Sequence, residues 1–321
     1  MDAVYRLVER RGGISRLGDL AQRAIHWNEF YVRAALLQQL RYPYVPLMRA
    51  SALPSALCQE AAELASRTQA KLPVCDAPML SLLDGLHQLS LTANSRWKSR
   101  VVSSAIGNVM YPVEYHLQVL MAEQANDTSD EREVLDSTFI FNALAIASQI
   151  FLWVALRHGW VRCGLLELFL RSPLHDIYLH MLIRALEKRD AGMVWIRERC
   201  PEALVWVLFV GAACAFPGGP ERVWFVEKLR VVIGLTRLKR AEDFEDILRL
   251  FPWTDGLCKT ACGDIWLEAT TSAALRGDGN SESAPPALSW RSRYGEESLS
   301  SVKYFLCSRR FGIGNPDVVG G

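Results

Sequence analysis

Two histidines and an aspartate are the first candidates for metal chemistry in this chain. His175, Asp176 and His180 lie within the sequence HDIYLH, and zinc accepts imidazole and carboxylate ligands. Their spacing does not favour a shared metal, because residues five apart on a helix point about 140° away from each other. The histidines are better explained as polar surface residues or as a hydrogen-bonded pair in the core, so we predict no metal site here.

The cysteines are the second candidates. Cys258 and Cys262 are four residues apart, which places both thiols on one face of a helix, as metal binding could use. Ile265, Trp266 and Ala269 continue that face, so the pattern favours a buried core stripe. The eight cysteines include no Cys-x-x-Cys pair, and most stand in apolar helical patterns where a thiol behaves as a small hydrophobic group. This usage is typical of a reducing intracellular compartment.

Motifs for nucleotide binding and nucleophilic catalysis are missing from the sequence. Gly12-Gly13 and Gly218-Gly219 follow predicted helices, whereas a phosphate-binding loop follows a strand. No Gly-x-Ser-x-Gly or His-Glu-x-x-His sequence is present. The basic residues Arg237, Lys239 and Arg240 could form a nuclear address or a phosphate contact, but solvated helix ends commonly carry such charges. We predict no catalytic residue, no cofactor, no metal and no enzyme activity.

The composition of the chain gives no support for binding to a strongly charged partner, and it favours a folded core. Half of the 321 residues are hydrophobic and the formal net charge is +1, so no global basic field favours nucleic acid. The start, MDAVYR, lacks the basic and apolar regions of a secretory signal. The apolar segment 139–156 is near the lower limit for a membrane span. Because Asn142, Ser148 and Gln149 interrupt it and no basic flank precedes it, we predict a buried core helix and no membrane contact.

The element that organises the prediction is the unbroken apolar run 203–216. It is too long for an ordinary strand and too short to span a bilayer, so it predicts a helix buried on all sides. Pro201 and Glu202 suit its first turn, and Pro217-Gly218-Gly219-Pro220 ends it. Gly211 and the neighbouring alanines would let other helices approach closely.

Periodicity and helix breakers predict helices along most of the chain. In the first part of the chain, helices are expected over 2–11, over 14–40 with a break near Gly18, from a cap at Ser51 or Ser55 to 69, and from Asp76 onward. In the middle, they are expected over 97–124 with an interruption at Tyr111-Pro112, from a cap at Ser129 or Asp130 to 158, and over 160–170 and 174–189. Three more follow Pro220, and the last of them starts at Thr254-Asp255. Val4, Leu7 and Val8 are expected on one apolar side of the first helix. The helix from Asp76 is expected to bury a stripe of Met79, Leu82, Leu83, Leu86 and Leu89. The second of the three helices after Pro220 is expected to bury Phe244, Ile247, Leu248 and Phe251. Sustained alternation and hairpin signals are absent, so the predicted fold class is all-α, built from packed helical hairpins.

The composition changes near residue 276. The sequence RGDGNSESAPP begins a segment with little apolar surface to offset the entropy of ordering. We therefore predict one all-helical domain over residues 1–275 and a flexible, disordered tail over residues 276–321. The acidic stretch 126–133, NDTSDERE, is expected to be a solvated loop with a capped helix start.

Three blocks together resemble the fungal-specific transcription factor domain, which usually follows a binuclear zinc-cluster DNA-binding domain. The first, VYRLVERRGGISRLG (4–18), is similar to a family helix that ends in Arg-Gly-Gly. The second, EALVWVLFVGAACA (202–215), is similar to the family's core helix, with Trp206 and Gly211 at the expected positions and Val205 where leucine is usual. The third joins ERVWFVEKL (221–229) to FPWTDGLCKTACGDIWLEA (251–269).

The resemblance implies a transcription-regulator-like protein in the nucleus. The chain has no six-cysteine zinc cluster, it begins at the middle of the family domain and so is N-terminally incomplete relative to it, and residues from 276 onward match no known block. The domain would then bind protein partners, such as a DNA-binding regulator or a second copy, or a small-molecule effector, and would reach DNA only indirectly. Two alternatives are a cytoplasmic helical binding scaffold with no transcriptional role and a helical enzyme of unrecognised class.

Overall fold

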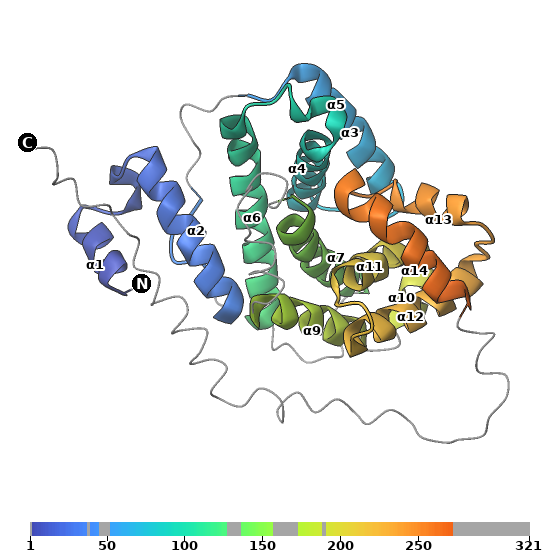
Figure 1. The fold of residues 1–321 in the computed structure, drawn as a ribbon. Coiled ribbons are helices and arrows are strands. Elements are labelled where there is room, and N and C mark those ends of the chain that lie inside the picture. The colour runs from blue at the N-terminus through green and yellow to red at the C-terminus, as the bar shows by residue number, and fades with distance from the viewer. Residues whose placement is uncertain are drawn as a thin grey trace, which may run out of the picture. The chain divides into compact units, whose positions relative to one another are not determined.

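The computed structural model describes residues 2–36, 39–44, 52–126, 136–156, 173–187 and 191–271. All regular secondary structure within these residues is helical (Figure 1), which confirms the predicted all-α class. The helices and shorter helical turns are α1 (Asp2–Arg10), η1 (Ile14–Arg16), α2 (Asp19–Leu36), α3 (Ser55–Gln69), α4 (Ala77–Ala93), α5 (Ser95–Lys98), α6 (Ser103–Asn126), α7 (Asp136–Phe151), η2 (Leu152–Leu156), α9 (Pro173–Glu187), α10 (Ala191–Arg197), α11 (Pro201–Cys214), α12 (Pro220–Thr236), α13 (Ala241–Leu248), η3 (Asp255–Lys259) and α14 (Thr260–Thr271).

Helix α11 is the buried centre of the fold. Every residue from Ala203 to Ala212 is buried, as predicted from the unbroken apolar run. Pro201 occupies its first turn, and the helix ends at Cys214, two residues before the predicted boundary. Helices α7, α10, α12, α13 and α14 pack against it, and Figure 1 shows them gathered around it. A helix with no polar face is stable only when other elements cover it on all sides.

Close helix packing depends on a glycine and a tryptophan of α11. A Cβ atom added to Gly211 would lie 2.4 Å from the Phe225 ring of α12, so the two helices meet where α11 has no side chain. On another side of the helix, the Trp206 ring stacks on Phe251, with 5.7 Å between ring centroids. Its Nε1 donates a hydrogen bond to the Pro252 carbonyl at 3.1 Å, which satisfies the one polar atom of this buried ring.

The helices before α11 pack mainly against their neighbours in sequence. Contacts join α3 to α4, α4 to α6, α6 to α7 and α7 to α9, the arrangement expected of packed helical hairpins. The Asp76 side chain accepts a hydrogen bond from the Met79 amide at 2.9 Å, so it caps α4 as predicted. The predicted stripe of α4 is buried along its length: Met79, Leu82, Leu83, Leu86 and Leu89.

One predicted helix break is wrong. Helix α6 continues through Pro112, although proline removes one backbone hydrogen bond and costs about 3 kcal/mol in a helix interior. Both neighbours of the proline, Tyr111 and Val113, are almost fully buried. Their tertiary packing outweighs the local preference of the proline.

The apolar side predicted for α1 is buried only in part. Val4 and Leu7 are exposed, whereas Tyr5 and Val8 are buried. Tyr5 packs edge-on against Tyr42, with 5.7 Å between ring centroids. The helix is therefore oriented by a residue that returns to it from the segment after α2, which a local pattern does not reveal.

Other predicted boundaries have mixed outcomes. The break near Gly18 is confirmed, because η1 precedes it and α2 follows it. Ser55 is the first residue of α3 and makes no cap, since Pro54 precedes it in the cap position. Phe251 is buried, but it lies beyond the end of α13. The loop predicted over 126–133 starts one residue too early, because Asn126 is the last residue of α6. The rest of that loop, the caps at Ser51, Ser129 and Asp130, the helix 160–170 and the tail 276–321 lie outside the described residues.

The segment considered as a membrane span is Ser137–Leu156, which comprises most of α7 and η2. Within the described residues it is the one helix long and apolar enough to cross a bilayer, and 83% of its apolar window is buried by the rest of the protein. It packs against α6, α9 and α11. Its position in the fold is the core position that we predicted.

A buried histidine connects α3, α4 and the segment after α13. The His87 side chain is almost fully buried, and its Nε2 lies 2.7 Å from Thr68 Oγ1. Because the Thr68 hydroxyl donates to the Leu250 carbonyl, His87 Nε2 carries the hydrogen and donates to Thr68. Burial lowers the pKa of His87 to about 4, since the imidazolium would lose its hydration.

We expect Gly211→Ala to lower the free energy of unfolding by about 1–3 kcal/mol, because the added methyl group collides with Phe225. The matched control is Gly263→Ala in α14, where no atom lies within 4 Å of the added Cβ. The control should be stabilised by about 0.5–1 kcal/mol through helix propensity. Urea unfolding of both variants measures the difference. Equal stabilisation of the two would contradict the close approach of α11 and α12.

Acid should destabilise the fold through His87. Its pKa is about 4 when folded and about 6.5 when unfolded, so the unfolded chain binds more protons between these values. The stability is complete above pH 6.5 and falls by up to about 3 kcal/mol as the pH drops to 4. Denaturant midpoints of wild type and His87→Gln across this range measure the effect. A wild-type loss no steeper than that of the variant would show that His87 is not the sensitive group.

Candidate functional site

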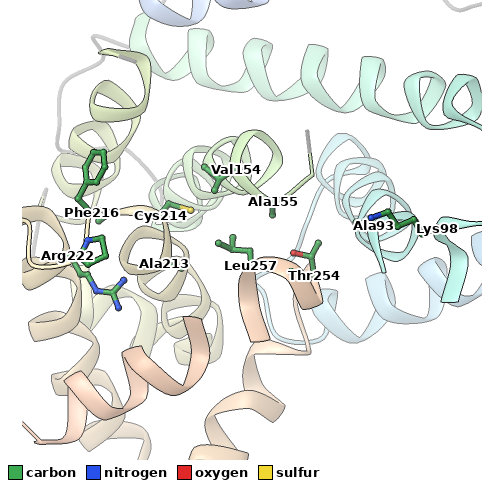
Figure 2. A pocket seen from close by; sticks show the side chains of 13 residues that line it. Ala93, Lys98, Val154, Ala155, Ala213, Cys214, Phe216, Arg222, Thr254 and Leu257 are labelled. Carbon is green, nitrogen blue, oxygen red and sulfur yellow. The ribbon is translucent and has the colours of Figure 1, made fainter. Parts of the chain in front are cut away.

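A pocket of about 470 Å³ opens at the C-terminal end of α11 (Figure 2). Its volume lies within the range of small-molecule sites, roughly 300–1,000 Å³. Five separate parts of the chain line it. They are the end of α4 together with α5, the turn η2, the end of α11 with the following loop, the first turn of α12, and η3 with the preceding Thr254. Residues far apart in sequence therefore share one cavity.

Small side chains and two unusual helical turns leave the space open. Ala93, Ala155, Ala213, Ala215 and Gly256 all line the pocket, and none reaches far enough to fill it. The turns η2 and η3 are both π-helical, they contact each other, and both contribute to the lining. Single π-helical turns are rare and occur frequently at functional sites.

The backbone carbonyls that have no intrahelical partner at the end of α11 accept hydrogen bonds from two side chains. Arg222 Nη1 donates to the Ala212 carbonyl at 3.1 Å. His175 Nε2 donates to the Cys214 carbonyl at 2.7 Å, so this nitrogen carries the hydrogen. Arg222 also binds Glu268 through Nε and Nη2, at 3.0 and 2.7 Å. Both side chains complement the negative end of the helix.

Two polar groups of the pocket are not committed in this way. The Thr254 side chain is 3% exposed, and its hydroxyl makes no hydrogen bond to a nitrogen or oxygen atom of the described residues. Within the described residues the side chain interacts with the Cys258 thiol, which is a weak hydrogen-bond partner. Lys98 lines the pocket from the last position of α5 and is exposed. No described carboxylate lies within ion-pair distance of its ammonium group.

The corner that carries Lys98 is held against the segment that carries Thr254. Asn94 precedes α5, and its Oδ1 accepts a hydrogen bond from the Asp255 amide at 3.0 Å. The Asp255 carboxylate accepts from Trp253 Nε1 at 3.2 Å. The hydroxyl and the ammonium group therefore belong to elements that are fixed to one another.

The cysteine thiols near the pocket have low reactivity. Burial raises the pKa of Cys258 to about 12 and that of Cys262 to about 11. Burial also raises the pKa of Cys214, which lines the pocket. These thiols stay protonated at neutral pH, and the protonated form is a poor nucleophile. Ile265 and Ala269 are buried as well, which confirms the predicted core stripe.

His175 and His180 do not form a joint site. His175 is buried and bonded to the Cys214 carbonyl, whereas His180 is half-buried. His180 Nδ1 donates to the Asp176 carbonyl at 2.7 Å, and its Nε2 lies 3.6 Å from Glu221 Oε1. Each histidine therefore has its own structural partner. Among the residues that the structure places, no group of three or more His, Cys, Asp or Glu side chains could hold a metal ion.

The glycine pairs and the basic run lie at chain turns. Gly12, Gly13 and Gly218 have φ angles of 85°, 96° and 73°, which glycine adopts without strain. Arg237 ends α12 in the left-handed conformation, and Arg240 pairs with Asp243 at the start of α13. Arg237 and Arg240 therefore stand at helix ends, as predicted, while a nuclear address or a phosphate contact stays an alternative.

The sequence did not indicate the pocket. Lys98 stands in an ordinary polar stretch, and Thr254 precedes a predicted helix start, so neither has a local signal. One pattern could have helped: the small residues Ala212, Ala213 and Ala215 stand just before the chain leaves α11. Small residues at the end of a buried helix leave space there, but only the fold shows which segments surround it.

Comparison with family models, with curated proteins and with solved structures finds no match for this chain. Its function is therefore inferred from the residues and their arrangement.

We expect Arg222→Met to lower the free energy of unfolding by about 1–3 kcal/mol, because it leaves the buried Ala212 carbonyl without its charged donor. The matched control is Arg240→Met, whose ion pair with Asp243 is at the surface and which should unfold like wild type. Thermal and urea unfolding report both. An Arg222→Met protein as stable as the control would show that the end of α11 does not need this side chain.

Proposed function

We propose that the chain is the regulatory module of a transcription-regulator-like protein, which acts by binding protein partners and an effector. In this proposal it neither reads DNA nor catalyses a reaction. One observation carries the proposal: the blocks 202–215, 221–229 and 251–269, which resemble the fungal-specific transcription factor domain, meet around a single pocket.

Direct contacts join these blocks. Trp206 of block 202–215 donates to the Pro252 carbonyl of block 251–269. Phe225 of block 221–229 packs against Gly211 of block 202–215. Arg222 of block 221–229 binds Glu268 of block 251–269. These three blocks therefore pack together, and each contributes residues to the pocket lining, as an effector site between helices requires.

The chemistry of the pocket supports binding rather than catalysis. Its walls are mostly apolar, and Lys98 lines it with an ammonium group that has no ion-pair partner among the described residues. Cys214 is held as a thiol by burial, and the adjacent His175 is bonded to a backbone carbonyl. Such groups can orient a ligand, whereas a nucleophile and a general base need freer side chains with shifted pKa values.

An exposed apolar strip on α12 supports a protein partner. Val231 and Leu235 are 59% and 58% exposed and lie one turn apart on α12. Val223, 47% exposed, lies two turns before Val231, with Glu227 between them. Clustered exposed aliphatic side chains of this kind mark interaction surfaces more often than isolated ones. In the proposal this strip contacts a DNA-binding regulator, so the module reaches DNA only through that partner.

Chromatin immunoprecipitation of the tagged protein, expressed from its own locus, tests the proposal. We expect enrichment at discrete promoters, while the purified chain does not bind the same DNA in a mobility-shift assay. The double variant Val231→Glu/Leu235→Glu should lose enrichment but unfold like wild type, because exposed substitutions change stability by only about 0.5 kcal/mol. Val74→Glu, at a 95% exposed position in another part of the chain, is the matched control.

Three results would contradict the proposal. A cytoplasmic protein with no promoter enrichment would favour the scaffold function. Tight, specific DNA binding by the purified chain would contradict the indirect route to DNA. Turnover of a substrate by the purified protein, with a bound metal or nucleotide, would favour a helical enzyme.

A further inference from the structure

We infer that the pocket at the end of α11 binds a small apolar carboxylate, with the carboxylate at Lys98 and the apolar body against α11, η2 and η3. This inference rests on the proposed function, because it takes the pocket to be the effector site. It adds the chemical class of the effector and the residues that select it.

The walls of the pocket favour an apolar body. The lining includes the apolar side chains of Val154, Ala213, Phe216, Pro217 and Leu257. Figure 2 shows Val154, Ala213 and Leu257 around the centre of the pocket and Phe216 at the end opposite Lys98. Burying apolar ligand surface against such walls yields roughly 25 cal/mol for each Å² removed from water. A compact, strongly hydrated ligand would gain little from this lining.

The charge on the ligand is set by Lys98. Its neighbours Arg96 and Arg100 are committed to other groups, since both stack over the Trp97 ring and Arg96 also pairs with Glu60. Lys98 has no such partner in the described part of the chain and lines the pocket. Arg222, the other cation of the lining, is bound by Glu268 and the Ala212 carbonyl. Lys98 is therefore the cation free to receive an anionic group.

Thr254 borders the pocket but does not compete with Lys98 for the ligand. Its hydroxyl oxygen is buried, and its side chain interacts with the Cys258 thiol. The Asn94–Asp255 hydrogen bond holds the Lys98 corner against the segment of Thr254, so the ammonium group is kept at one edge of the cavity and the carboxylate is placed there.

Negative charge around the pocket is either paired with a hydrogen-bond donor or screened by solvent. The partial negative charge at the end of α11 is met by Arg222 and His175. The Asp255 carboxylate accepts from the Trp253 indole and is exposed to solvent, which screens its charge. An entering carboxylate is therefore not opposed by a buried carboxylate.

The test is calorimetric binding to the purified full chain, with three probes of equal length used below their micelle concentrations. Decanoate carries the carboxylate, decanol is neutral, and decyltrimethylammonium is cationic. We expect decanoate to bind about five- to tenfold more tightly than decanol, with the cation weaker than both. Raising the salt concentration should reduce the advantage of decanoate, because Lys98 is exposed.

Variants assign the two parts of the ligand to their residues. Lys98→Met should bring decanoate to the affinity of decanol and leave decanol unchanged, while the matched control Lys259→Met, an exposed lysine outside the lining, should leave both unchanged. Ala213→Leu should abolish binding of all probes by filling the pocket. If that variant fails to fold, Ala93→Leu fills the cavity from another side.

Equal affinity for decanoate and decanol, or an unchanged preference in Lys98→Met, would overturn the inference. Binding that survives both filling variants would place the ligand elsewhere and would also overturn it. These outcomes are separate from those of the proposed function: selective binding without promoter enrichment would contradict only the transcriptional role, and promoter enrichment without selective binding would contradict only the ligand class.

Discussion

The rest of the structure depends on the complete burial of α11. Its side chains have no polar face, so every turn must be covered by another helix, and the surrounding helices must adjust to its surface. Gly211 allows the closest approach, because the Phe225 ring occupies the space where a side chain would stand. Trp206 anchors another side by stacking on Phe251 and bonding to the Pro252 carbonyl. The core is therefore specific in shape as well as apolar.

Burial also creates a problem at the end of the helix, where backbone carbonyls lose their helical partners. Arg222 and His175 reach in from α12 and α9 to satisfy the Ala212 and Cys214 carbonyls. The small residues beside these carbonyls do not fill the space around them, and the turns η2 and η3 border that space. The pocket therefore lies where the buried helix ends. The ammonium group of Lys98 is not used by the capping.

Much of the fold could be predicted from the sequence, and the failures share a cause. The start of α11, the stripe of α4 and its Asp76 cap depend on residues close in sequence, and each was predicted. Pro112 inside α6 could not be, because buried neighbours override its local effect. The candidate pocket was missed for the same reason: it joins residues from 93 to 257 whose meeting depends on the whole fold. The cysteine stripe was predicted, since its four-residue spacing is local.

Hydrogen exchange followed by mass spectrometry tests the central claim most directly. If α11 is the covered centre of the fold, its amides from Val205 to Cys214 should exchange only when the whole domain unfolds, at rates that follow global stability. Gly211→Ala should then accelerate this exchange in proportion to its loss of stability. Exchange of these amides as fast as those of α1, or unaffected by the substitution, would show that α11 opens independently and would contradict the account of both the core and the pocket at its end.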